Sequence, residues 1–189
     1  HCGCYGKFDK KTSIPSIRYW KAKQRIDKQI IVGLHISYRA ATNDTALKLE
    51  KWILEKCLGR QVSKCRFHYL KFALPYGYDR LEQFGFTDDY SMAYSNVAGY
   101  RAGTSRPFSF YNIEKEGESK LTIHPLIVMD KTLRSNMKLN VDAAYQYIDT
   151  LKKSSNAIGG DFTTLFHNEN VADLNGWGEW GKKLKKNRT

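Results

Sequence analysis

Apolar residues recur along this chain in two spacings, and the two kinds of segment alternate. Short runs rich in β-branched and aromatic residues predict strands, and apolar positions three to four residues apart predict helices. The predicted strands span 29–35, 62–70, 87–92, 120–130 and 161–167. The predicted helices span 42–59, 76–86, 140–159 and 176–186, and the glycine-containing segment 94–111 is predicted to be mostly loop.

The segment 42–59 shows the helix signals most clearly. It opens with capping residues, continues with apolar residues on one side and closes at a glycine. The capping residues are Thr42, Asn43 and Asp44, the apolar face is assigned to Leu47, Trp52, Leu54 and Leu58, and the closing residue is Gly59. The segment 140–159 has the same arrangement, with Asn140 as its cap and Gly159 at its end.

Strands that alternate with helices predict βα units and therefore an α/β fold with a parallel sheet or barrel. No internal repeat or low-complexity segment divides the chain, so we expect a single domain over 1–189. Folds of this class place their chemistry at the carboxyl ends of the strands. We therefore expect functional side chains at the carboxyl ends of the predicted strands.

Composition is typical of an ordered globular protein. The 189 residues are 41% hydrophobic and 13% aromatic, which argues against disorder. No apolar run approaches a membrane span, and nothing resembles a signal peptide. The cysteines form no C-x-x-C pair and suggest no disulfide framework. They are Cys2, Cys4, Cys57 and Cys65. We therefore expect free thiols and a cytoplasmic protein.

The formal net charge is +12, and much of it lies near the two ends of the chain, including a basic tail at 182–189. Such a balance is compatible with binding to nucleic acid or another anionic polymer. No recognition motif accompanies the charge, and solvated basic termini that aid solubility explain it more simply. We expect no nucleic-acid partner.

Four histidines fall in or at the end of predicted strands: His35, His68, His124 and His167. A single histidine on an apolar strand is usually a hydrogen-bonded core residue. Four at equivalent ends of separate strands favour a shared site, because a parallel barrel would bring them to one mouth. Neutral imidazole is the commonest metal ligand and a natural acid or base near pH 7.

Several short motifs, in their order and spacing, resemble the NodB-type polysaccharide deacetylases of carbohydrate esterase family 4, and particularly a divergent bacterial branch. The motifs are GLHISY, RFHY, DDYS, GYRAGTSRPFSFY, HPLIVMD and LFHNE. The resemblance extends from about His35 to the terminal helix. It implies a distorted (β/α) barrel and a hydrolase that removes N- or O-acetyl groups, at amide or ester bonds, from an acetylated carbohydrate. A divalent metal, often zinc, would activate the attacking water.

The resemblance also implies roles for individual residues. His35 and His68 would bind the metal. Arg66 would orient the catalytic carboxylate and pair with Asp89, and the backbone N–H of Tyr69 would lie in the oxyanion hole.

The closing L-x-H motif is matched by two residues of the last predicted strand. Leu165 would line the acetyl pocket, and His167 would be the general acid that protonates the leaving amine or alcohol.

The chain departs from the family pattern at two motifs. Arg39 stands where the second histidine of H-x-x-x-H belongs, and His68, in the family's proline position, would replace the lost ligand. The first motif, T-F-D-D, supplies both a metal ligand and the catalytic base, and no match precedes His35. Asp9 and Asp27 lie among lysines and other charged residues, not in a strand. We therefore expect a domain incomplete at its N-terminus, which binds metal weakly or not at all and is inactive in this form.

Further candidates lie outside the classical motifs. Arg101 would bind a sugar hydroxyl or carboxylate, or tie down its glycine-rich loop through a salt bridge. Asp130 would orient His124 or His167, or cap the next segment. Four aromatic residues are candidate sugar platforms, although the helical spacing of the two tryptophans favours core packing. These are Tyr94, Tyr100, Trp177 and Trp180.

Three functions therefore stay open on the sequence alone. The first is metal-dependent deacetylation of a carbohydrate. The second is binding of a glycan without catalysis, on the same fold, because the base and one ligand are missing. The third is a basic nucleic-acid-binding domain, which the charge supports but which leaves the strand-end histidines unexplained.

Overall fold

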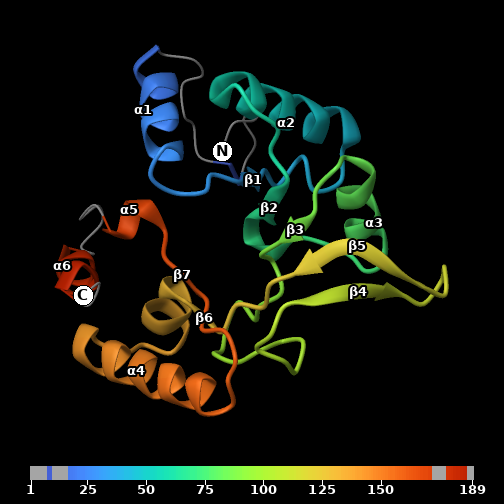
Figure 1. Ribbon diagram of the computed structural model, residues 1–189. Helices are drawn as coiled ribbons and strands as arrows, with labels where there is room; N and C mark the ends of the chain where they lie inside the picture. The colour runs from blue at the N-terminus through green and yellow to red at the C-terminus, as the bar shows by residue number, and fades with distance from the viewer. Residues whose placement is uncertain (1–7, 10–16, 172–177, 187–189) are drawn as a thin grey trace. The chain divides into compact units, whose positions relative to one another are not determined.

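The computed structural model describes residues 8–9, 17–171 and 178–186 (Figure 1). The chain forms two compact units. Unit 1 comprises His1–Ser91 and Phe108–His124, and unit 2 comprises Met92–Pro107 and Pro125–Thr189. No helix within the described part of the chain is long and apolar enough to cross a membrane.

Unit 1 is an α/β unit built on a five-stranded sheet in the order β1-β2-β3-β5-β4. The strands are β1 (Leu34–Ile36), β2 (Lys64–Phe67), β3 (Asp88–Asp89), β4 (Phe108–Asn112) and β5 (Gly117–Ile123). The first three strands and β5 are parallel, as the alternation of strands and helices predicted. β4 pairs antiparallel with β5, so the prediction of a loop over its residues was wrong.

Strand pleating gives this sheet two different faces. One face is buried and apolar, with Ile36 and Ile123 fully buried and Phe67 1% exposed. Helices α2 (Asp44–Leu58) and α3 (Tyr76–Gln83) supply buried side chains to the same core. The opposite face carries polar residues that are only half-buried. These are His35, Lys64, Arg66, Asp88 and His124.

Helix α2 has the predicted ends. The side chain of Asn43 accepts a hydrogen bond from the backbone N–H of Ala46 at 2.8 Å. Gly59 ends the helix in the left-handed region at φ 72°. The predicted apolar face needs one correction, because Trp52 is 55% exposed whereas Glu50 is 1% exposed.

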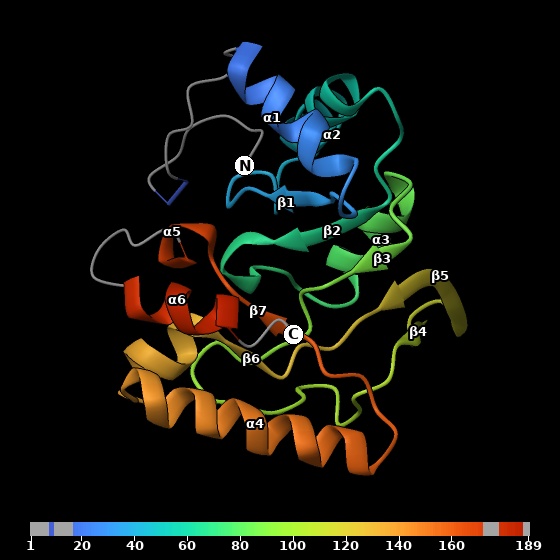
Figure 2. The same ribbon diagram turned by 60° about the vertical axis from the view of Figure 1, so that its left-hand side comes forward.

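Helix α1 (Ile17–Asp27) was not predicted, because its sequence is mostly polar. It packs beside α2 (Figure 2). Gln24 Nε2 donates to the carbonyl oxygen of Cys57 at 2.8 Å, and Asp27 forms an ion pair with Arg60 just beyond the end of α2. Tertiary contacts with α2 therefore help to stabilise this helix.

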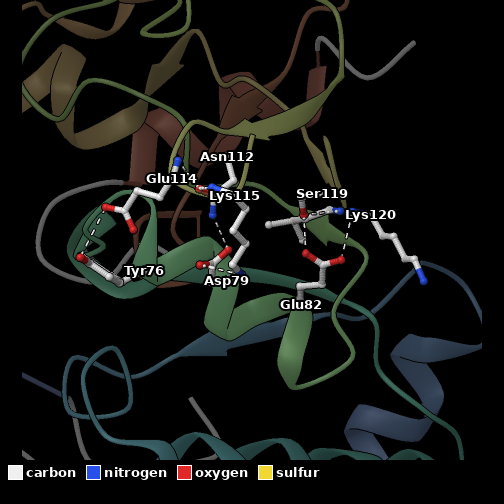
Figure 3. A network of polar contacts seen from close by, with 9 residues as sticks. Tyr76, Asp79, Glu82, Asn112, Glu114, Lys115, Ser119 and Lys120 are labelled. Carbon is white, nitrogen blue, oxygen red and sulfur yellow. Dashed lines mark hydrogen bonds and ion pairs between the residues drawn. The ribbon is translucent and has the colours of Figure 1, made fainter. Parts of the chain in front are cut away.

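The β4–β5 hairpin is attached to α3 by polar contacts (Figure 3). Asp79 accepts from Asn112 Nδ2 at 2.8 Å and pairs with Lys115 at 2.9 Å. One turn further along α3, Glu82 accepts from the Ser119 hydroxyl at 2.8 Å and from the backbone N–H of Lys120 at 3.2 Å. These contacts fix the edge of the sheet to the helix.

Unit 2 contains a pair of parallel strands, β6 (Val128–Met129) and β7 (Thr164–Leu165). Its helices are a π-helix at Thr132–Asn136, α4 (Val141–Ala157), α5 (Asn168–Val171) and α6 (Gly178–Lys186). Asn140 caps α4 as predicted, accepting from Ala143 N at 2.9 Å. Trp180 is 5% exposed within the apolar core of this unit, as its helical spacing favoured, and Trp177 lies outside the described residues.

Candidate functional site

His35 and His68 come together in unit 1. Parallel pairing aligns His35 with Arg66, and His68 follows β2 directly, so both imidazoles lie near the carboxyl ends of neighbouring strands. His35 Nε2 lies 2.8 Å from His68 Nδ1, and the two rings meet edge to face. The predicted association of these two residues is therefore present.

The partners of the two rings define a chain of hydrogen bonds. Arg66 donates to His35 Nδ1 from Nη2 at 2.8 Å and from Nε at 3.2 Å. His68 Nε2 lies 3.0 Å from the carbonyl oxygen of Phe8. A guanidinium only donates and a carbonyl only accepts. His35 Nδ1 must therefore accept and His68 Nε2 must donate, so each neutral ring carries its proton on Nε2. All four ring nitrogens are then engaged.

This arrangement does not fit a divalent metal as it stands. A metal-bound histidine coordinates through one ring nitrogen and donates the N–H of the other to an acceptor. Nδ1 of His35 instead faces the guanidinium of Arg66, which has no acceptor. Among the residues that the structure describes, no group of three His, Cys, Asp or Glu side chains could hold a metal ion. Zinc stays a prediction for this chain.

Asp9 is a buried carboxyl group, which the sequence interpretation did not predict. Its side chain is 7% exposed, although lysines surround it in the sequence. Oδ1 accepts from the backbone N–H of Tyr38 at 2.9 Å, and the buried Oδ2 has no hydrogen-bond partner among the described residues. Phe8 and Asp9 match the middle of the T-F-D-D motif, with Lys10 in place of its last residue. That two-residue match was the sequence feature that could have drawn attention to Asp9.

Glu50 supports the backbone that follows β1. Its carboxyl group accepts from the backbone N–H of Ser37 at 3.0 Å and makes a second, short contact with the Ser37 hydroxyl. The same hydroxyl accepts from Ala40 N at 3.1 Å. Burial raises the pKa of Glu50 above its usual value, against the opposing effect of the Ser37 hydrogen bonds. Glu50 and Asp9 thus hold two consecutive peptide units, at Ser37 and Tyr38.

The predicted ion pair between Arg66 and Asp89 stays a prediction, because the two residues interact electrostatically but lie on opposite faces of the sheet. In the parallel register Cys65 aligns with Asp89, so Asp89 points to the buried face and Arg66 to the opposite face. Asp89 is fully buried and accepts two hydrogen bonds from Ser91. Burial raises its pKa to about 6. Neighbouring strand residues point to opposite faces, which the motif alone does not reveal.

His124 belongs to a second polar cluster on the half-buried face of the sheet. Its Nε2 lies 2.7 Å from Asp88 Oδ1, which also pairs with Lys64 at 3.0 Å. The ring of Tyr90 stacks on that of His124, with the centroids 4.3 Å apart. The structure thus places His124 beside Asp88 and Tyr90, directly after β5, and its predicted role in substrate binding stays a prediction.

Tyr69 lies on an unusual turn after β2. Its φ is 56° and that of Leu70 is 51°, both in the left-handed region. The Tyr69 side chain is 61% exposed, and its ring makes edge contacts with those of Phe8, Tyr38 and His68. A group of aromatic rings therefore lies beside His68, with Tyr69 in direct contact with its imidazole. The role of the Tyr69 N–H in an oxyanion hole stays a prediction.

His167 has a carboxylate partner in unit 2. Asp130 is 1% exposed, and its Oδ1 lies 2.6 Å from His167 Nδ1. Asp130 Oδ2 accepts from the backbone N–H of His167 and from Asn170 Nδ2, each at 2.8 Å, and Lys131 N donates to Oδ1 at 2.7 Å. Burial favours a higher pKa for Asp130, but these hydrogen bonds outweigh it and the pKa is lowered. Of the two histidines proposed as its partner, Asp130 orients His167.

The other candidates of unit 2 have different surroundings. Leu165 is buried in β7, and Arg101 is exposed in its loop. Tyr100 is anchored by contacts of its hydroxyl with Asp161 O at 2.6 Å and Ser155 Oγ at 2.7 Å, so it is a structural residue of the loop. Binding roles for Leu165 and Arg101 stay predictions. So does the convergence of His167 with the imidazole pair.

Comparison with known proteins supports the fold. No protein-family model and no curated protein matches the sequence. Among solved structures, the chain is similar to the crystal structure of a "putative polysaccharide deacetylase" from Mycobacterium smegmatis, with a TM-score of 0.66 and 15% sequence identity. The similarity covers 89% of this chain but 59% of that protein. The chain therefore has an α/β fold that resembles the fold of the mycobacterial protein.

Proposed function

We propose that this chain acts on acetylated carbohydrate and hydrolyses an N- or O-acetyl group. The observation that carries the proposal is the pairing of Asp130 with His167. A buried carboxylate that accepts the Nδ1–H of a half-buried histidine fixes the ring and leaves Nε2 to exchange a proton with a substrate. The resemblance of the LFHNE motif, and the similarity of the fold to the mycobacterial protein, support the assignment to acetyl hydrolysis.

In this proposal His167 is the proton donor to the leaving amine or alcohol. Asp130 holds the ring in one orientation through its contacts with the Nδ1 and backbone N–H groups. A bound metal would polarise the acetyl group in the family that the motifs resemble. Because the contacts of His35 do not fit that metal, no step here depends on it.

A second function is favoured by one specific observation. Arg66 occupies Nδ1 of His35, and Lys10 stands where the T-F-D-D motif ends in a carboxylate. A protein with these features would retain a carbohydrate-binding surface without efficient hydrolysis. The aromatic rings of Phe8, Tyr38 and Tyr69 beside His68 suit the stacking of a sugar ring.

One experiment separates these functions. The full chain is incubated with N-acetylated chitin oligomers and with acetylated xylan, with and without added zinc. Released acetate and calorimetric binding are measured in parallel. Acetate release that His167→Ala abolishes supports hydrolysis. Binding without release supports the second function. Neither binding nor release on any acetylated carbohydrate tested would contradict both.

A further inference from the structure

We infer that Arg66 locks His35 in the Nε2–H tautomer and thereby prevents the His35–His68 pair from coordinating a divalent metal. The inference rests on the direct contacts of the two rings. Arg66 donates to His35 Nδ1 at 2.8 and 3.2 Å, so that nitrogen must offer its lone pair. The proton of the neutral ring is then on Nε2, which is the nitrogen that faces His68.

The contacts of His68 fix the same Nε2–H tautomer in its ring. Its Nδ1 lies 2.8 Å from His35 Nε2 and accepts that proton, and its Nε2–H donates to Phe8 O at 3.0 Å. The lone pair of His68 is therefore used inside the pair, and the lone pair of His35 is used by Arg66. A metal ion needs a free lone pair from each imidazole, so it must first break two contacts of this chain.

The chemistry of residue 66 decides whether that rearrangement is favourable. Arginine carries donors only and is always charged, so it repels a cation and cannot accept an N–H. Glutamine at this position would present an amide oxygen that accepts Nδ1–H from His35. The ring would then turn its Nε2 lone pair toward His68, which is the arrangement found for metal-bound histidines. Lysine, a donor with the same charge, is the matched control.

Tautomers are read directly by long-range proton–nitrogen NMR of the ¹⁵N-labelled full chain, with both rings neutral. We expect the Nε2–H pattern for His35 and His68 in the wild-type protein. Arg66→Gln should shift His35 to the Nδ1–H pattern, and Arg66→Lys should leave it unchanged. Finding His35 as the Nδ1–H tautomer in the wild-type protein would overturn the inference without any variant.

Metal affinity is measured by zinc calorimetry on the same proteins. We expect Arg66→Gln to bind zinc at least tenfold more tightly than the wild type, and Arg66→Lys to show no gain. Adding His68→Ala to Arg66→Gln should remove the gain, which assigns the zinc to this pair and not to other cysteines or histidines. Wild-type zinc binding that is tight and is lost in His35→Ala would contradict the inference.

Circular dichroism checks that each variant is folded. If Arg66→Gln does not fold, Arg66→Met, which removes the donors without adding an acceptor, is titrated in its place and should also gain zinc affinity. The inference does not rest on the proposed function, since neither readout involves a sugar. Failure to release acetate would leave these measurements unaffected.

Discussion

Asp89 accepts two hydrogen bonds from Ser91 at the end of β3. The Ser91 backbone N–H donates to Asp89 Oδ2 at 2.9 Å, and its hydroxyl donates to Oδ1 at 2.7 Å. The same hydroxyl accepts from the backbone N–H of Phe67 at 2.9 Å, which ties β3 to the end of β2. Asp89 is fully buried in this position, and burial raises its pKa to about 6 despite the hydrogen bonds.

This pair predicts a pH dependence of stability. The folded-state pKa of Asp89 lies above its ordinary value of 3.8, so the folded protein binds the proton more tightly than the unfolded chain. The stabilisation of the folded state by the proton on Asp89 is complete below the ordinary pKa and is lost as the pH rises through about 6. The loss amounts to up to about 3 kcal/mol of unfolding free energy. Urea unfolding at a series of pH values measures it.

The control is Asp89→Asn, which cannot ionise. Other buried carboxyl groups contribute slopes of either sign, so the difference between the wild-type and variant curves isolates Asp89. We expect this difference to change steeply between the two pKa values and to be flat above them. Parallel curves for the two proteins would show that Asp89 is not protonated in the folded state at mildly acidic pH.

Backbone conformation in the β4–β5 hairpin predicts opposite effects of one substitution at two nearby positions. Glu116 is exposed in the turn with φ 48°, a region that costs a non-glycine residue about 1 kcal/mol or more. Glu116→Gly should therefore stabilise the protein by about 1 kcal/mol. Glu118 lies in β5, where glycine should destabilise by about 0.5–1 kcal/mol.

Thermal unfolding of the two glycine variants tests this pair of predictions. Their melting temperatures should move in opposite directions from that of the wild type. Equal shifts of the same sign would show that the φ of Glu116 in solution differs from that in the structure.

The sequence predicted the elements whose signals are local. Helix α2 begins and ends at its capping residues because Asn43 and Gly59 act within one turn of the chain. The parallel sheet followed from the alternation of segments. β4 was missed because its aromatic residues lie within a stretch of glycine and proline that predicts a loop. Helix α1 was missed because its sequence is mostly polar, and its contacts with α2, such as that of Gln24 with the carbonyl oxygen of Cys57, join distant parts of the chain.

The faces of these elements were harder to predict than their positions. Trp52 is exposed and Glu50 buried on the same helix, since the N–H and hydroxyl of Ser37 satisfy the buried carboxyl group. Asp9, which has lysines as neighbours in the sequence, is buried for a similar reason, because the backbone N–H of Tyr38 donates to its carboxylate. Such polar contacts join segments about 13 to 29 residues apart, and no local pattern encodes them.

Glu50 should therefore be more important for stability than its sequence context suggests. Glu50→Ala leaves the buried donors of Ser37 without an acceptor, at about 1–3 kcal/mol for each. Glu50→Gln retains one oxygen acceptor and should cost about half as much. Chemical denaturation measures both, and Glu118→Gln, an exposed carboxyl group, should stay within about 0.5 kcal/mol of the wild type. A neutral Glu50→Ala would contradict the buried contact.

Asp130 accepts four hydrogen bonds, and this makes its replacement by asparagine informative. Three donors come from His167 and Asn170, and the fourth is the backbone N–H of Lys131. An asparagine has one acceptor oxygen, so its amide N–H₂ group would face at least one of these donors. We expect Asp130→Asn to lower the unfolding free energy by about 2–4 kcal/mol, because buried donors lose their acceptor.

The same variant separates a positioning role for Asp130 from a merely structural one. Loss of the carboxylate removes the acceptor that holds the Nδ1–H of His167, so the ring loses its fixed orientation and acetate release should fall. General acid catalysis contributes about 10²–10⁴-fold, so kcat should drop by a factor in that range while KM changes little. Asn170→Ala removes one donor to Asp130 but leaves the carboxylate, and serves as the control with near-normal turnover. If Asp130→Asn folds and retains full kcat for acetate release, Asp130 has only a structural role, and the pairing with His167 cannot carry the proposed function.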